Sequence, residues 1–163
     1  MPAVPSSLPR VTPGGPAAFL GAHRQVIDGI ASTATRVLAP EESGAMCLFD
    51  QAAGLQFTLP PPVVGMQFEF LTKVTITSNS AKVLTDAATT FMVGAAAMLN
   101  NAAASGQAFS ANGTTHRSVN GNGTTTGGII GDRIRCTAIS TTLWAVDAVM
   151  VQSGTAATPF ATS

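Results

Sequence analysis

Apolar and polar side chains alternate along residues 55–78, where the chain shows its clearest structural pattern. Every second residue is apolar over 55–59 and again over 66–70. A period of two places these side chains on one face of a pleated strand. Prolines at 60–62 separate the two runs, and because proline fixes φ and donates no backbone hydrogen bond, the first strand ends there. The pattern predicts two half-buried strands around a proline corner.

Short strand patterns recur along most of the chain. The further predicted strands lie at residues 46–49, 74–76, 82–84, 91–93, 107–110, 115–119, 133–140 and 142–151. Residues 95–105 are rich in alanine and predict a helix and a loop equally well, because the segment is short and flanked by glycine. The Asn-Gly pairs at 112–113 and 122–123 predict two successive hairpin turns, since both residue types tolerate positive φ. Together these signals predict an all-β fold, a β-sandwich or a jelly-roll-like barrel.

The chain divides into three parts by composition. Residues 1–35 contain five prolines among the first twenty, which favours an extended, polyproline-like N-terminal arm, with a possible short helix over residues 19–34. Either the arm is a disordered tail or it becomes ordered on a neighbouring subunit; both interpretations stay open. Residues 36–152 are predicted to form the β domain, and the small, uncharged residues of 153–163 a C-terminal tail.

Charge is scarce in this sequence. Its 163 residues carry eight basic and eight acidic side chains, so the net charge near zero argues against nucleic acid as a partner. Charged residues make up 10%, far below the usual quarter or so, and none lies between Asp86 and Arg117. An uncharged surface promotes association. We therefore expect contact with other subunits.

The sequence gives no sign of a membrane or of export. No run of 18 apolar residues exists, and the first fifteen residues are broken by prolines, so neither a membrane span nor a secretory signal is expected. Without export, Cys47 and Cys136 are expected to be buried free thiols, although a disulfide stays possible.

Candidate catalytic groups do not form a recognisable cluster. His23 and His116 have no further ligands at metal-binding spacing, so we expect no metal and no cofactor. His116 with either cysteine could form a catalytic dyad, and Glu69 with Asp147 a carboxylate pair. Structural roles explain all of these residues better. The glycine-rich residues 121–128 lack the lysine of a phosphate-binding loop. We expect no catalytic residues.

Three short segments carry a family resemblance. SGAMCLFD at 43–50, FTLP at 57–60 and GMQFEF at 65–70 resemble a recurrent pattern of tailed-bacteriophage virion proteins. In that pattern a turn, a short strand, a TLP corner and an aromatic strand begin a small β domain. The later Asn-Gly turns and the strand of Trp144 fit the same pattern.

The resemblance implies a head decoration (cement) protein. Such a protein is a small β-sandwich, often trimeric, that binds the outside of the assembled capsid and strengthens the joints between capsomers. Its partners would be the major capsid protein and copies of itself, with neither nucleic acid nor membrane. Its place would be the virion surface, after assembly in the host cytoplasm. No binding residues carry over from the family.

The residues themselves suggest where contacts would form. The candidate capsid or subunit contacts are the larger apolar side chains of the arm, the uncharged segment and the C-terminal part, namely Val4, Leu8, Val11, Phe19, Leu20, Phe91, Met92, Met98, Leu99, Trp144 and Phe160. Two other classes of function stay open. One is a tail-fibre or receptor-binding module whose loops at 111–128 contact a cell-surface glycan. The other is a small hydrolase acting on cell wall.

Overall fold

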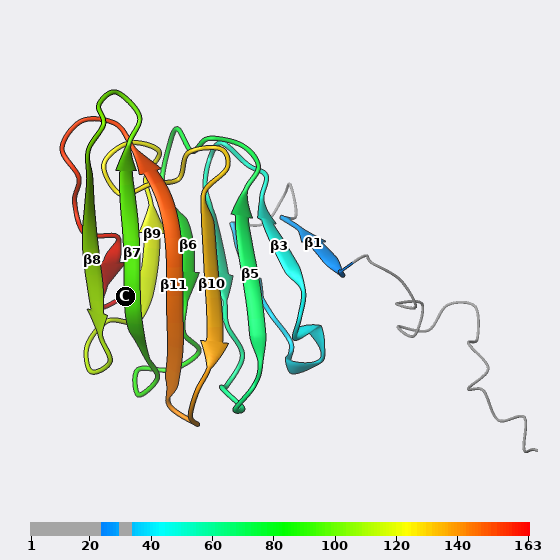
Figure 1. The fold of residues 1–163 in the computed structure, drawn as a ribbon. Coiled ribbons are helices and arrows are strands. Elements are labelled where there is room, and N and C mark those ends of the chain that lie inside the picture. Colours follow the sequence, from blue (N-terminus) through cyan, green and yellow to red (C-terminus); the bar gives the residue numbers. More distant parts are fainter. Residues whose placement is uncertain (1–23, 30–33) are drawn as a thin grey trace, which may run out of the picture.

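Two mixed β-sheets face each other across one hydrophobic core in the computed structural model, which describes residues 24–29 and 34–163 (Figure 1). Sheet A has the order β1 (Val26–Asp28), β3 (Met46–Phe49), β5 (Gln67–Thr72), β10 (Arg133–Ala138), β11 (Leu143–Gln152), β7 (Phe91–Asn100) and β8 (Gly106–Asn112). Sheet B has the order β12 (Phe160–Ala161), β9 (Ser118–Gly121), β6 (Ala81–Leu84), β4 (Leu55–Thr58) and β2 (Thr35–Val37).

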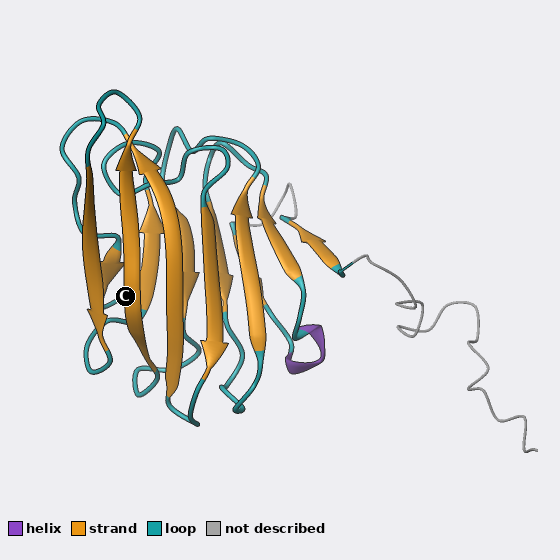
Figure 2. Ribbon diagram, viewed as in Figure 1, coloured by secondary structure: helices purple, strands orange, loops and turns teal. Residues whose placement is uncertain are grey.

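The all-β prediction is confirmed and the sheets form a sandwich-like pair, while jelly-roll connectivity stays a prediction. Figure 2 shows strands joined by loops, with a single short 3₁₀ turn, η1 (Pro40–Glu42). No helix in the described part of the chain is long and apolar enough to cross a membrane.

Several predicted features lie outside the described residues. They are most of the N-terminal arm, most of the short helix predicted over residues 19–34, His23, and the five arm contacts Val4, Leu8, Val11, Phe19 and Leu20. The described residues of this region correct the prediction: residues 26–28 form strand β1 where a helix was predicted, and with β2 they belong to the sandwich and not to an arm.

The first six strands wind between the two sheets. Strands β1, β3 and β5 lie parallel in sheet A, and β2, β4 and β6 lie parallel in sheet B. Each connection therefore crosses from one sheet to the other, and the proline corner is such a crossing. The two alternating runs are confirmed as β4 and β5, but they belong to different sheets and do not pair with each other.

The second half of the molecule closes sheet A with two antiparallel pairs. Strand β7 pairs with β8, and β10 pairs with β11 through the turn predicted near Ser140. Strand β10 also pairs with β5, and β11 lies parallel to β7 over its full length. Sheet A thus contains strands from both halves of the chain, and the two halves meet where β5 pairs with β10.

The alanine-rich segment forms a strand, so its helical alternative is wrong. Ala96 and Met98 are buried, whereas Ala95 and Ala97 are exposed, which is the period of a strand. Helix propensity is a weak preference, and here β11 and β8 pair with both edges of β7. Residues 101–105 make the turn to β8.

Three other predictions need correction. The Asn-Gly pair after β8 makes no hairpin, because β9 lies in sheet B, and the pair at 122–123 opens a loop to β10. Residues 74–76 form no strand, although Ile76 is buried. The segment predicted as a C-terminal tail contains β12, because Phe160 returns to fill the core and is only 3% exposed.

Aromatic side chains fill the space between the winding strands. Phe49 of sheet A packs edge-on against Phe57 of sheet B, with ring centroids 5.3 Å apart. Phe70 lies 5.5 Å from Phe57 and 6.1 Å from Phe49. In the second half, Trp144 packs against Phe68 at 6.1 Å. All five side chains are buried. The contacts of Phe57 with Phe49 and Phe70 join the two sheets, whereas Phe68 and Trp144 pack together on the inner face of sheet A.

Replacing Phe57 with alanine should remove the contact that joins the sheets. A large cavity at a fully buried aromatic typically costs about 3–5 kcal/mol of unfolding free energy. The matched variant Phe57→Leu should cost roughly 1.5 kcal/mol or less, since it keeps most of the apolar volume. Urea unfolding measures both; a loss below about 1 kcal/mol for Phe57→Ala would contradict this account.

Candidate interaction surface

The outer face of sheet A is apolar along its central strands. Alternate residues of β7 and β11 point into the core, and those between them point outward. The register places these outward side chains next to each other across β11, β7 and β8. We call this group the apolar outer face; it consists of Phe91, Val93, Ala95, Ala97, Leu99, Leu143, Ala145, Val149, Val151 and Ala108. One charged side chain, that of Asp147 on β11, stands among them, opposite Ala95 of β7 and Arg135 of β10 in the register. Leu99 and Val149 are each 49% exposed.

One end of the sandwich carries a second exposed apolar group. Val63 and Val64 lie in the proline corner and are 58% and 66% exposed, and Ile139 in the β10–β11 turn is 49% exposed. The Gly65 N–H donates to the Ala138 carbonyl at 2.9 Å, which holds the corner against that turn. We call these three residues the apolar tip; it lies at the lower end of the sheet in Figure 1.

The apolar tip adjoins the apolar outer face. The Ile139 N–H donates to the carbonyl of Leu143 at 3.0 Å, and Leu143 stands opposite Phe91 in the register. Because proline fixes φ, the prolines before Val63 restrict the corner and hold its valines outward. The two groups thus form a nearly continuous apolar surface.

Charges on this side of the molecule gather around Glu69. Its carboxylate accepts from Arg24, lies 3.2 Å from Arg133 Nε and 3.7 Å from an Arg135 guanidinium nitrogen. Arg24 also donates to the carbonyls of Gly44 and Ala45, which ties the residues before β1 to the sheet. Glu69 is therefore part of a structural ion-pair network.

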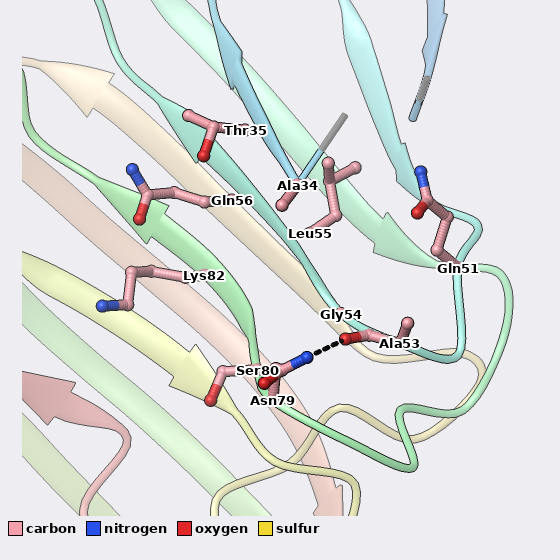
Figure 3. Close-up of a pocket in the computed structure, with 10 residues that line it drawn as sticks. All are labelled: Ala34, Thr35, Gln51, Ala53, Gly54, Leu55, Gln56, Asn79, Ser80 and Lys82. Atoms are coloured by element: carbon pink, nitrogen blue, oxygen red, sulfur yellow. Dashed lines mark hydrogen bonds between the residues drawn. The ribbon is translucent and has the colours of Figure 1, made fainter. Parts of the chain in front are cut away.

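The outer face of sheet B has a different character. Its outward positions are mostly uncharged polar residues, with Gln56, Thr58 and Lys82 among them. A hollow of about 530 Å³ lies at the start of β4 and β6 (Figure 3). Asn79 forms one wall and donates to the Ala53 carbonyl at 2.8 Å. The two outer faces of the sandwich thus offer different chemistry. That of sheet B is mostly polar, whereas that of sheet A is apolar over β7 and β11, apart from Asp147, and charged over β5 and β10.

The two Asn-Gly-Thr-Thr segments form the same kind of loop. The amide oxygen of Asn112 accepts from the backbone N–H groups of residues 114–116 at 2.9 to 3.3 Å. The amide oxygen of Asn122 accepts from those of Thr124 and Thr126 at 2.9 and 3.1 Å. These are side-chain turns in which asparagine replaces a backbone acceptor. Both amide groups are therefore used within their own loops.

Asp132 holds the glycine-rich loop from inside. It is 2% exposed, and its carboxylate accepts from the N–H groups of Gly128 at 2.7 Å, Ile129 at 3.1 Å and Val151 at 2.7 Å. Burial raises the pKa of Asp132 despite these bonds. Two of the loop's N–H groups thus bind a carboxylate of the protein itself, which fits a structural loop better than a phosphate site.

The structure divides the predicted contact residues into two groups. Met92, Met98, Trp144 and Phe160 are at most 3% exposed and fill the core of the subunit, so their side chains offer no surface. Leu99 and the partly buried Phe91 lie on the apolar outer face. Sequence reasoning ranked residues by size and β-pattern, and both criteria also select the core.

The sequence analysis missed the apolar tip. Val63 and Val64 follow three prolines and precede Gly65, so they fall in a loop where the strand pattern has ended. Two consecutive large apolar residues in such a loop cannot both point into a core, and this feature of the sequence could have predicted an exposed apolar side chain.

The structure does not bring the candidate catalytic residues together in pairs, and several of them make other contacts. Glu69 and Asp147 share the outer face of sheet A, on strands separated by β10, with Arg135 between them in the register. His116 stacks on Phe160 at 5.9 Å. The His116 carbonyl accepts from the N–H of Met92 on β7 at 2.8 Å, and β11 separates β7 from β10, the strand of Cys136. Among the described residues, no group of three or more His, Cys, Asp or Glu could hold a metal ion.

The cysteines are buried free thiols, as predicted. Cys47 and Cys136 lie on β3 and β10 with β5 between them, opposite Phe70 and Phe68, so two strand spacings put their Cα atoms more than about 9.5 Å apart, which a disulfide cannot bridge. Burial raises the pKa of Cys47 to about 12, and it raises the pKa of Cys136 further. Neither thiol is therefore a reactive nucleophile at neutral pH.

Comparison with known proteins gives no relative for this chain. No protein-family model matches the sequence, and no curated protein and no solved structure matches it. The resemblance to tailed-phage virion proteins therefore stays a prediction.

Replacing Asp132 with alanine should destabilise the fold strongly. Three backbone N–H groups would lose their acceptor, and each buried, unsatisfied group costs about 1–3 kcal/mol. We expect a loss of roughly 3 kcal/mol or more in urea unfolding. Asp147→Ala is the matched control, because Asp147 is exposed and forms no ion pair within the described chain; it should change stability by less than about 0.5 kcal/mol. Equal effects of the two changes would contradict the role of Asp132.

The two thiols should also make stability fall at alkaline pH. Their pKa values are raised in the folded state, so their contribution is complete below the unfolded value near 9.0 and is lost as pH rises toward the folded values. Between pH 9 and 11 each thiol should remove roughly 1 kcal/mol per pH unit. The control is the double variant Cys47→Ala/Cys136→Ala. Its unfolding free energy should fall less steeply with pH, and identical slopes would refute the prediction.

Proposed function

We propose that this chain is a structural virion protein that binds the outside of an assembled phage capsid and stabilises the joints between capsomers. The observation that carries the proposal is the apolar surface formed by the outer face of sheet A and the apolar tip. An exposed apolar patch of this kind marks a protein–protein contact in soluble proteins. In the proposed arrangement it faces the capsid protein, and the polar outer face of sheet B faces solvent.

The dimensions of the surface suit a docking role. Strands β7 and β11 have ten residues each, at about 3.4 Å per residue, and with β8 the surface is three strands wide at about 4.8 Å per strand, or roughly 34 by 14 Å. That area of about 480 Å² is about three fifths of the roughly 800 Å² that one partner contributes to a standard interface. The apolar tip and further subunit contacts would supply the remainder. A homo-oligomer, with a trimer as the expected state, therefore fits better than a lone monomer.

The scarcity of charge indicates how the contact would work. With 10% charged residues, attachment depends on apolar burial and main-chain pairing more than on salt bridges. Binding should then change little between low and high salt, because screening acts on exposed charges. Within this proposal residues 1–23 act as an extended arm on adjacent subunits, because residues 26–28 and 35–37 already belong to strands of the sandwich.

A second candidate is a receptor-binding module of a phage tail. The hollow in Figure 3 favours it, because Gln56, Asn79 and Lys82 line it. Each of these side chains donates one hydrogen bond within the chain, and their remaining polar groups are of the kind that bind sugar hydroxyls. The loops at 111–128 support it less, since their asparagine side chains bond within the loops. Binding of purified protein to cell-surface polysaccharide, with no binding to capsids, would favour this candidate.

The double variant Val63→Ser/Val64→Ser should weaken capsid attachment. Two exposed apolar side chains would no longer be buried at the contact, which predicts a loss of affinity of about tenfold or more. The control is Val37→Ser, because Val37 is 69% exposed on the opposite outer face. Each variant is added to undecorated capsids, and its occupancy is then measured on the purified particles. Equal occupancy for the tip variant and the control would refute the proposal for the tip.

A further inference from the structure

We propose that the free edge of β8 accepts the N-terminal segment of a neighbouring copy as an additional β-strand. The inference rests on the proposed oligomer and names the contact that would hold it together. The free backbone groups of β8 and the positions of the prolines in residues 1–16 support it.

Strand β8 is the longest unpaired edge of the described sandwich. It has seven residues, whereas the other three edge strands, β1, β2 and β12, have two or three. Within the described chain β8 pairs only with β7. Figure 1 shows it at one end of sheet A, with β1 at the other.

The hydrogen bonds of β8 show which backbone groups are free. Asn100 N–H donates to the Ser105 carbonyl, and Gly113 N–H to the Met92 carbonyl, both at 2.9 Å. In an antiparallel pair the bonded positions alternate, so odd-numbered residues of β8 face β7. The even-numbered residues present both their N–H and C=O groups outward; they are Gly106, Ala108, Ser110 and Asn112.

One of these outward groups is already bonded. Asn112 N–H donates to Nδ1 of His116 at 3.2 Å, which confirms the direction of the even-numbered groups and ends the free edge there. Three residues, Gly106, Ala108 and Ser110, remain without a partner on that side within the described structure. They offer six backbone groups to an incoming strand.

Nothing in β8 protects this edge. Natural edge strands avoid aggregation by means of lysine, proline, a bulge or a covering loop. The residues of β8, GQAFSAN, contain no charge and no proline, and the register with β7 runs without a bulge. An edge that is long, regular and uncharged is suited to accept a strand.

The N-terminal sequence fits as the added strand. Successive residues of a strand direct their backbone groups to opposite sides, so positions of one parity face the partner. Pro5, Pro9 and Pro13 are all odd-numbered, and the even-numbered Pro2 and Pro16 lie outside residues 4–12, where the added strand would form. Residues 4, 6, 8, 10 and 12 therefore keep every N–H available for β8, while the prolines face away. There they would also prevent a further strand from adding.

The position of β1 favours a neighbouring copy as the source. Residue 24 leads into β1, at the opposite edge of sheet A from β8, and six strand spacings of about 4.8 Å separate the two edges by about 29 Å. An arm that leaves one edge and binds the opposite edge of the next copy makes a head-to-tail contact. Such contacts close into rings when the rotation permits, as a trimer requires.

Two neighbouring serine-to-proline changes test the inference. Ser6→Pro removes an N–H that would bond to β8, whereas Ser7→Pro removes one that would face away. We compare mass by light scattering up to about 1 mM and amide hydrogen exchange at Ala108 and Ser110, with purified full-length chains and no capsid. The unchanged chain and Ser7→Pro should form oligomers in which these amides exchange at least tenfold more slowly than in Ser6→Pro. The Ser6→Pro variant should lose both the oligomer and the protection.

Each other outcome overturns the inference. Equal behaviour of the two variants would show that parity does not matter, and oligomers of Ser6→Pro with protected amides would indicate pairing of β8 with another β8. Protection in a monomer would indicate the chain's own arm, and a monomer without protection would show that no strand is added. Because no capsid is present, these outcomes are independent of capsid attachment, which the tip variant tests separately.

Discussion

The contact among Phe49, Phe57 and Phe70 is the interaction on which the rest of the structure depends. These rings come from three consecutive strands, β3, β4 and β5, and the middle strand belongs to the opposite sheet. Each strand therefore buries its aromatic side chain only if the chain crosses between the sheets at every connection. The parallel order within both sheets follows from that requirement, and so does the placement of the proline corner at one end of the sandwich.

The same packing leaves the outer faces free to differ. Since the core uses only the inward residues of each strand, the outward ones are under no constraint from folding alone. On sheet B they are mostly polar, and on β7 and β11 they are apolar with the exception of Asp147, although both sheets have an apolar interior. Folding does not explain this difference, whereas a partner on one side does. The apolar outer face and the apolar tip are therefore the strongest indication of function.

Local patterns in the sequence predicted individual strands well and their partners poorly. The alternation around Phe57 and Phe68 correctly predicts β4 and β5, because inward and outward positions differ chemically. Which sheet receives each strand depends on contacts between residues far apart, and no local pattern records that. The alanines of β7 show the same limit, since their strand form depends on pairing with β11. The tip valines were missed because a loop has no period to read.

The pairing of β7 with β11 has a consequence for how the chain acquires its structure. Strand β7 pairs with β11, which follows it by about forty residues, and β5 likewise pairs with β10. Closing loops of this length costs chain entropy before the pairing can offset that cost, which slows folding. Sheet A therefore cannot be completed before β10 and β11 have been synthesised, and the apolar outer face is assembled only then. A subunit built in this way cannot present that face while β11 is missing, which limits association of incomplete chains.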